Sequence, residues 1–91
     1  MKTPLYKEYA NRQPLAVLPL SNFGGLAVLD ILPNYGETLY IVAWDFGTGY
    51  QQIRRHKEQY STAGRPFFTK GNRRYYLDQF MKTERSAENE H

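Results

Sequence analysis

Two long apolar runs separated by a turn limit most strongly what this chain can fold into. Residues 26–32 read LAVLDIL, residues 38–46 read TLYIVAWDF, and Pro33-Asn34-Tyr35-Gly36 lies between them. Proline, asparagine and glycine favour tight turns, and the second run is rich in β-branched and aromatic residues. We therefore predict an antiparallel β-hairpin at the centre of the fold.

The predicted hairpin has two chemically different faces. If Asn34-Tyr35-Gly36 closes the turn, Asp30 pairs with Tyr40 and Leu26 pairs with Trp44. Side chains alternate between the two faces of a strand. One face then carries only aliphatic residues, which we expect to form the core: Ala27, Leu29, Ile31, Leu39, Ile41 and Ala43. The other face is mixed and includes Asp30, Tyr40 and Trp44.

The next segment, YQQIRRHKEQY, is polar, and the sequence leaves open whether it forms a third strand or a short helix. As a strand, it would pair Ile53 with Ala43 and would place Arg54 and His56 on the mixed face. A slip of one residue would send every side chain to the opposite face. We expect Asp30 on this face to form a structural pair with Arg54, His56 or the Tyr40 hydroxyl.

The mixed face, with Tyr40, Trp44 and His56, has two alternative roles. It is either a partner interface, including one between two copies of the chain, or it is covered within the molecule by a C-terminal helix. We favour the second alternative, with Phe80 and Met81 packed over Trp44, because an exposed apolar patch of this size promotes aggregation.

The flanking segments complete the expected fold. Residues 1–13 are polar and are expected to form a flexible arm, and PLAVLPL contains a proline that favours an edge strand. A hairpin with the tip Lys70-Gly71-Asn72-Arg73 is expected to place Tyr75 in the core and Tyr76 at the rim. Asp78 is a candidate N-cap for a helix over residues 79–85, and residues 86–91 are expected to fray as an acidic tail.

Together these segments predict one β-rich α+β domain over residues 14–85. We expect a small twisted antiparallel sheet of five or six strands with one short C-terminal helix. A partly open barrel is one form of such a sheet, but two apolar faces on the central hairpin argue against full closure. At 91 residues the core is small, so a homodimer through the mixed face is also expected.

Positive charge is concentrated in one part of the chain. The net charge is +3, but residues 50–76 alone carry +6, with Glu58 as the one acidic residue, whereas residues 1–49 and 77–91 are both net negative. The same block holds six aromatic residues. Cations that neutralise phosphates and rings that stack on bases are typical of a nucleic-acid-binding surface. The alternative is a soluble sheet with arginine on its wet face and rings in its core.

The residue patterns give little support to an enzyme. The chain has no cysteine and two histidines, one of them the last residue, so we expect no metal site, no cofactor and no catalytic residues. The glycines of Phe46-Gly47-Thr48-Gly49 lack the lysine and hydroxyl residue of a nucleotide loop. The absence of cysteine fits a reducing compartment, and no stretch resembles a signal peptide or membrane span. We therefore expect a cytoplasmic protein.

The strings IRRHKEQYSTAGRPFF and RRYYLDQFM resemble a pattern in small proteins carried on plasmids, phages and conjugative elements of gut Gram-positive bacteria. The resemblance covers roughly residues 37–81. It transfers no functional residue, because no activity is assigned to such proteins. It implies an accessory role in DNA handling during transfer, in transcriptional control, or in inhibition of a host defence system.

Two functions follow as hypotheses. The first is a non-enzymatic, weakly sequence-specific nucleic-acid-binding protein, in which cationic and aromatic residues contact phosphates and bases: Arg54, Arg55, Lys57, Arg65, Lys70, Arg73 and Arg74, with Tyr50, Tyr60 and Tyr76. The second is a protein-interaction module, an inhibitor or adaptor of a nucleic-acid-handling or defence complex, whose basic patch docks on an acidic partner. In that case Tyr40, Trp44 and His56 form the interface. The sequence does not separate DNA from RNA or single from double strands.

Overall fold

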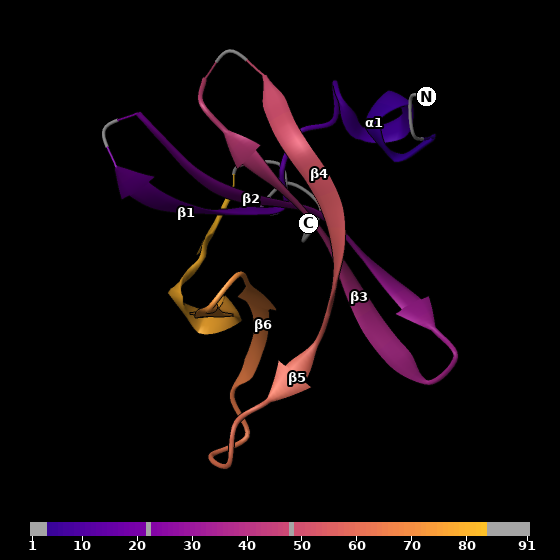
Figure 1. Cartoon of the computed structure of the whole chain (residues 1–91), viewed down its shortest axis with the longest axis vertical. Coiled ribbons are helices and arrows are strands. Elements are labelled where there is room, and N and C mark those ends of the chain that lie inside the picture. The colour runs from indigo at the N-terminus through magenta and orange to yellow at the C-terminus, as the bar shows by residue number, and fades with distance from the viewer. Residues whose placement is uncertain (1–3, 22, 48, 84–91) are drawn as a thin grey trace.

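The computed structural model describes residues 4–21, 23–47 and 49–83, which form two antiparallel β-sheets with little helix (Figure 1). The larger sheet has five strands in the order β4-β3-β2-β1-β8, and the smaller has three in the order β5-β6-β7. Both orders are open, so neither sheet closes into a barrel over the described residues. The elements are α1 (Pro4–Tyr9), β1 (Ala16–Ser21), β2 (Gly24–Asn34), β3 (Glu37–Asp45), β4 (Tyr50–Lys57), β5 (Gln59–Tyr60), β6 (Pro66–Lys70), β7 (Arg73–Tyr76), η1 (Leu77–Gln79) and β8 (Met81–Lys82).

The predicted central hairpin is present as β2 and β3, but its loop has two residues instead of three. Asn34 pairs with Glu37, and the loop residues Tyr35 and Gly36 have φ angles of 52° and 83°. Positive φ at both loop positions gives a turn whose twist matches that of the flanking strands. The shorter loop shifts the pairing near the turn by one residue from the predicted register.

A β-bulge in β2 restores the predicted register in the middle of the hairpin. Asp30 pairs with Ile41 and not with Tyr40 as predicted, whereas Val28 pairs with Val42 as predicted. One extra residue between Val28 and Asp30 compensates for the short loop. The bulge also places Asp30 on the same face as Ile41, away from the mixed face.

The polar segment that the sequence left open between strand and helix is strand β4. From Leu39 to Val42, β3 pairs with it in the predicted register, with Arg54 opposite Val42 and His56 opposite Tyr40. Beyond Val42 the register shifts by one residue, so Trp44 lies opposite Gln51 and the predicted pairing around Ala43 is interrupted. Ile53 nevertheless packs toward the aliphatic face, as predicted.

The aliphatic face of the large sheet packs against the N-terminal segment, and we call it the helix-side face. Its buried residues Ala27, Leu29, Ile41 and Ala43 cluster with Tyr9, the last residue of α1, which is only 2% exposed. Part of the segment that was expected to be a flexible arm thus belongs to the packed core. Because two of these four buried residues are alanines, the face leaves space for one large ring, which Tyr9 fills.

Asp30 anchors Tyr9 to the helix-side face. Its carboxylate accepts hydrogen bonds from the Tyr9 hydroxyl at 2.7 Å and from the Arg12 guanidinium at 3.1 Å. The predicted pairing of Asp30 with Tyr40, Arg54 or His56 is therefore wrong. The reason is the bulge, which turned Asp30 to the other side of the sheet.

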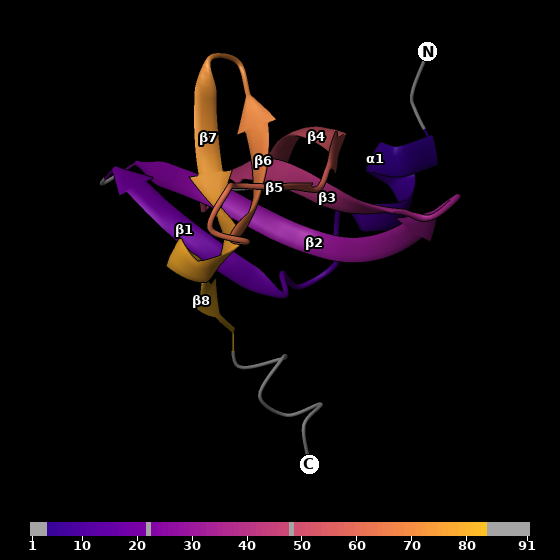
Figure 2. The same cartoon turned by 90° about the horizontal axis from the view of Figure 1, so that it is seen from below.

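The mixed face packs against the small sheet, and we call it the hairpin-side face. Leu26, Val28, Tyr40 and Val42 from the large sheet form one buried cluster with three aromatic residues that follow in the chain: Phe68, Tyr75 and Phe80. Figure 2 shows β6 and β7 rising from one side of the large sheet. The face is covered, as we favoured, and Tyr75 is buried as predicted. A β-hairpin provides most of the cover in place of a helix.

The predicted C-terminal helix is wrong over the described residues. The chain forms a single 3₁₀ turn, η1, and then the short strand β8, in which Met81 pairs with Val17 of β1. Asp78 does not cap a helix but binds the Arg65 guanidinium at 2.7 and 2.8 Å. Phe80 is 8% exposed in the core, and the extended backbone after it allows pairing with β1. Met81 is 56% exposed and does not cover Trp44.

Strand β1 was predicted to be an edge strand, but it lies between β2 and β8. The proline is tolerated because β8 pairs only with Ala16 and Val17, so Pro19 meets no partner on that side within the described chain. Residues 84–91, which include the predicted helix end and acidic tail, lie outside the described residues. Among the described residues, no helix has the length and apolar character needed to cross a membrane.

Candidate nucleic-acid interface

The basic residues that the sequence grouped together lie on three different surfaces. Strand alternation places Arg54 on the hairpin-side face and Arg55 and Lys57 on the helix-side face of β4. On β6 and β7, Lys70 and Arg73 share the inner face with Phe68 and Tyr75, whereas Arg74 shares the outer face with Phe67 and Tyr76. The structure thus brings together only part of the predicted set.

The first surface, which we call the tip surface, consists of Trp44, Phe46, Arg54, Lys70 and Arg73. The ammonium group of Lys70 lies 4.8 Å from the centre of the Trp44 ring. The Trp44 and Phe46 rings are stacked, with centroids 5.9 Å apart and planes 6° apart. The tip of the β6–β7 hairpin therefore places a cation over Trp44 of β3. The Trp44 ring in turn stacks on that of Phe46, the residue after this strand.

The two other cations of the tip surface are arginines. Arg54 is exposed on β4 opposite Val42, and Arg73 is exposed on β7 opposite Lys70. Neither forms an ion pair with any residue that the structure describes. Their charges are thus not neutralised within this part of the chain and are available to an anionic ligand.

His56 joins the two sheets and is not an exposed contact residue. Its Nδ1 lies 3.1 Å from the backbone oxygen of Thr69, and its ring centroid lies 5.0 Å from that of Phe68. Burial lowers the pKa of His56, and the nearby Lys70 and Arg54 lower it further, against the opposing effect of the Thr69 bond. The neutral imidazole therefore packs between β4 and β6, next to positive charge.

The predicted partner interface is largely inside the protein. Tyr40 is 3% exposed, and its hydroxyl donates a hydrogen bond to Glu58. Burial and this bond raise the pKa of Tyr40 above its usual range. Of the three predicted interface residues, Trp44 alone borders an accessible surface, through its contacts with Lys70 and Phe46.

On the second surface, the outer face of the small sheet, the cations are bound to other residues of the protein. Arg65 lies 4.0 Å above the Tyr76 ring and is held there by Asp78. Arg74 lies 4.5 Å above the Phe67 ring and donates a hydrogen bond to the Tyr76 hydroxyl at 3.3 Å. A carboxylate holds Arg65 and a hydroxyl holds Arg74 in addition to the rings, so both cations are less available to a ligand than those of the tip surface.

The third surface is the helix side of β4, where the predicted residues are dispersed. Lys57 forms an ion pair with Glu37 at 2.8 Å, and Tyr50 packs beside the helix-side cluster. Burial and the nearby Asp45 raise the pKa of Tyr50. Arg55 is exposed on the same side. These residues lack the ring stack of the tip surface.

Tyr60 lies apart from all three surfaces, on the short strand β5. Its side chain is 63% exposed, and its hydroxyl donates to Glu58 at 2.8 Å. This bond to the carboxylate raises the pKa of Tyr60. Because Glu58 also binds Tyr40, the ring lies beside a negative charge, which does not favour a phosphate ligand.

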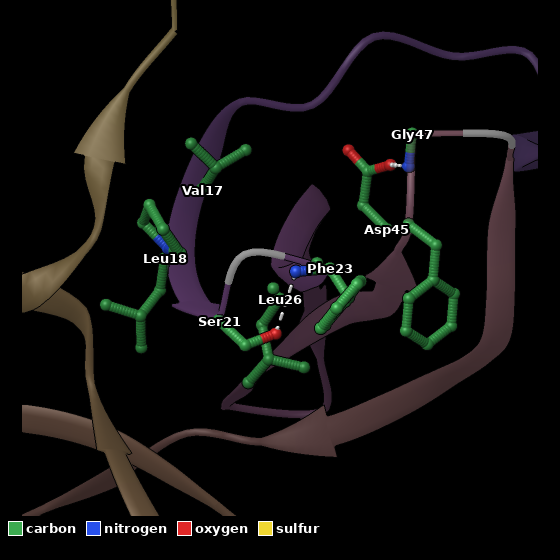
Figure 3. A pocket seen from close by; sticks show the side chains of 11 residues that line it. Val17, Leu18, Ser21, Phe23, Leu26, Asp45 and Gly47 are labelled. Carbon is green, nitrogen blue, oxygen red and sulfur yellow. Dashed lines mark hydrogen bonds between the residues drawn. The ribbon is translucent and has the colours of Figure 1, made fainter.

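A cavity of about 500 Å³ adjoins the tip surface at the end of the large sheet. Figure 3 shows the turn residues Ser21 and Phe23 beside it, with Val17 on one side and Asp45 and Gly47 on the other. Phe46 also lines it, so the cavity and the Trp44 stack share a ring.

Sequence reasoning missed Phe23, Phe46 and Asp45 as site residues. Phe23 is 82% exposed and Phe46 is 45% exposed, which is unusual for two phenylalanines at the same end of a sheet. The signal available in the sequence was Phe23, a large ring next to Gly24-Gly25 in a predicted turn. The sequence did not show that Phe23 and Phe46 line the same cavity.

Comparison with known proteins finds no match to this chain among protein-family models, curated proteins or solved structures. Within the described residues, no three histidine, cysteine or acidic side chains gather in a way that could hold a metal ion. The chemistry of the site therefore rests on its own geometry.

Proposed function

We propose that this chain is a non-enzymatic accessory protein that binds single-stranded nucleic acid through the tip surface. The observation that carries the proposal is the line of Lys70, Trp44 and Phe46, in which a cation contacts a stack of two rings. Proteins that bind single strands combine such ring platforms with a positive groove along the backbone of the nucleic acid.

Each part of the tip surface matches one part of a single strand. Phe46 offers a partly exposed ring on which a base can stack, and stacking contributes about 1–3 kcal/mol per base. Lys70 lies over the Trp44 ring, Arg73 is its cross-strand neighbour and Arg54 is exposed on β4, so these three cations can neutralise phosphates. A double helix keeps its bases stacked inside, so it would not use exposed rings at the end of a sheet.

The proposed phosphate-binding residues are fewer than the cations of the basic block, residues 50–76. Arg65 is ion-paired with Asp78, Arg74 is hydrogen-bonded to the Tyr76 hydroxyl, and Lys57 is ion-paired with Glu37. We therefore assign phosphate binding to Arg54, Lys70 and Arg73 and expect a smaller salt dependence than seven cations would produce. Three neutralised phosphates correspond to a slope of log affinity against log salt of about −2 to −3.

Fluorescence anisotropy with labelled single-stranded and double-stranded oligonucleotides at several salt concentrations tests this proposal. Lys70→Gln should reduce the magnitude of the salt slope by about 0.7–0.9, and Arg54→Gln combined with it by about twice that amount. Lys57→Gln is the matched control, because it removes the same charge from the helix side. Equal slopes for Lys70→Gln and Lys57→Gln would move the contact surface elsewhere, and no binding even at low salt would reject the function.

A protein partner is the alternative proposal, and a specific groove favours it. A cavity of about 670 Å³ lies between β1 and β7 and is lined by Leu18, Leu20, Arg73, Arg74, Tyr75 and Gln79. Leu20 is 38% exposed there, and Arg73 would suit an acidic segment with an apolar side chain. Leu20→Ala should weaken capture of such a partner and, because it changes no charge, should leave the salt slope for oligonucleotides unchanged.

A further inference from the structure

The cavity at the end of the large sheet is continuous with the tip surface through one shared ring. Phe46 lines the cavity and stacks on Trp44, and Trp44 contacts Lys70. A strand whose phosphates lie near Lys70 would therefore bring a base to the mouth of the cavity. About 500 Å³ is ample for one nucleobase, and ligand sites of this size are common.

The walls of the cavity suit a flat ligand. A side chain at Gly24 would place its Cβ only 2.7 Å from the Phe46 ring and 2.7 Å from the backbone oxygen of Asp45. The glycine thus allows the ring to lie against the backbone of β2. Phe23 lines the same cavity from the β1–β2 turn, so two phenylalanine rings contribute to its lining.

Asp45 provides the one acidic side chain in the lining. Its Oδ1 accepts a hydrogen bond from the backbone N–H of Gly47 at 2.9 Å, which orients the carboxylate at the end of β3 (Figure 3). Ionised carboxylates accept hydrogen bonds at several lone-pair positions on two oxygens. Asp45 therefore has acceptor capacity left for hydrogen-bond donors in the cavity.

We propose that this cavity holds one unpaired base of the bound strand and selects guanine through Asp45; this inference rests on the proposed function. Guanine presents two neighbouring donors on its Watson–Crick edge, N1–H and the N2 amino group, and these match the two oxygens of a carboxylate. Adenine and cytosine offer one amino group beside an acceptor that a carboxylate would repel, and thymine offers one N–H between two carbonyls. Unpaired bases are commonly read in this way, by ring stacking and by hydrogen bonds to this edge.

The experiment measures the affinity of the whole protein for a labelled thymidine oligomer of about ten nucleotides, and for the same oligomer with one central guanine, adenine or cytosine. We expect about tenfold tighter binding of the guanine oligomer, since good bidentate base contacts discriminate by roughly 5- to 150-fold. Equal affinity for all four oligomers would overturn guanine selection, while steep salt dependence in the same data would leave the proposed function standing.

Asp45→Asn is the decisive variant. Asparagine keeps an oxygen that can accept from Gly47 but replaces the second acceptor by a donor, so the ratio of guanine-oligomer affinity to plain-oligomer affinity should fall to about one. Glu37→Gln is the control for charge, because it also removes one negative charge but lies at the other end of β3. A persisting guanine preference in Asp45→Asn would reject the assignment of Asp45.

Phe23→Ala tests the cavity wall without disturbing the core, since this side chain is largely exposed. We expect about tenfold weaker binding of the guanine oligomer, as is usual for loss of a stacked ring. Folding of each variant is checked by its unfolding midpoint. Failure of every oligomer to bind at low salt would reject the proposed function itself; unchanged binding by Phe23→Ala alone would reject only the cavity as the base site.

Discussion

The two faces of the large sheet are buried in different ways. The helix-side face is a surface of small aliphatic residues, and one ring, Tyr9, closes it with its hydroxyl on Asp30. The hairpin-side face carries Tyr40 among its aliphatic residues, and it is covered by Phe68 and Tyr75 of the second sheet together with Phe80.

This difference places the candidate function on one face of the sheet only. Next to the helix-side cluster, Asp30 forms an ion pair with Arg12, so its charge is neutralised within the protein. The hairpin-side cluster instead extends to the β6–β7 tip, where Lys70 lies against Trp44. The face that holds the second sheet therefore also positions the cations and rings that we assign to ligand binding.

The largest expected effect comes from removing the ring at the centre of the hairpin-side cluster. Phe68 is fully buried and lies within 6.0 Å of the Tyr40, His56, Tyr75 and Phe80 rings, measured between centroids. Phe68→Ala should lower the free energy of unfolding by about 3–5 kcal/mol in urea denaturation. Leu29→Ala on the helix-side face should lower it by less. The opposite order would mean that the second sheet is only loosely attached.

The next effect concerns the anchor of the helix-side face. Tyr9→Phe removes the hydroxyl that donates to Asp30 and should lower the free energy of unfolding by about 1–2 kcal/mol, because Arg12 still satisfies the carboxylate. Tyr60→Phe removes an exposed hydroxyl and is the control, with no measurable change expected. A harmless Tyr9→Phe would show that packing alone holds α1.

The same tyrosine predicts a loss of stability at high pH. Burial, and then the bond to Asp30, raise the pKa of Tyr9 from 10.0 to about 12. The folded phenol thus keeps its proton where the unfolded one loses it, so its contribution is complete below pH 10 and is lost as the pH rises toward 12. Unfolding midpoints across this range should fall less steeply in Tyr9→Phe than in the unmodified protein.

A smaller pH effect is expected on the hairpin-side face, in acid. Because burial lowers the pKa of His56 below its ordinary value, the unfolded chain takes up the proton first. Stability is therefore complete above the ordinary histidine pKa of about 6.5 and falls as the pH drops through the lower pKa of the folded state. His56→Gln should flatten this part of the stability profile. An unchanged profile would assign the acid sensitivity to other groups.

The smallest expected effect separates two neighbouring arginines. Arg74 covers the Phe67 ring, so Arg74→Ala should lower the free energy of unfolding by about 0.5–1 kcal/mol. Arg73 forms no ion pair with a described residue, so Arg73→Ala should leave stability unchanged and reduce oligonucleotide affinity. Urea denaturation and anisotropy on both variants test the contrast, which fails if the two substitutions act alike.

Much of the sheet was predictable from local pattern. The apolar runs and the glycine-containing turns predicted β2, β3 and the β6–β7 hairpin, and alternation predicted the register of Arg54 and His56 on β4. Local pattern failed at residues 79–83, where a short helix was expected. The failure has a physical cause: burying Phe80 and pairing Met81 with β1 outweighed a weak helical preference.

The candidate site was predictable only in composition. The sequence identified the basic, aromatic-rich block, but it did not show that Arg65 and Arg74 lie over rings, or that Lys70 lies over Trp44 from a different sheet. The Lys70 contact with Trp44 joins the two sheets and depends on how they meet, on which periodicity along one strand carries no information. The rings under Arg65 and Arg74 belong to the small sheet, so those contacts depend on the pairing of β6 with β7.

Three features follow from the sequence alone: the β-rich class, the two unequal faces of the central hairpin and the concentration of positive charge in residues 50–76. Only the folded molecule shows which of the described cations form ion pairs and which residues line the cavity. The two kinds of information differ in the distance over which they act. Alternation and turn geometry act between neighbouring residues, whereas a one-residue bulge before Asp30 and the docking of the second sheet reassign side chains across the whole molecule.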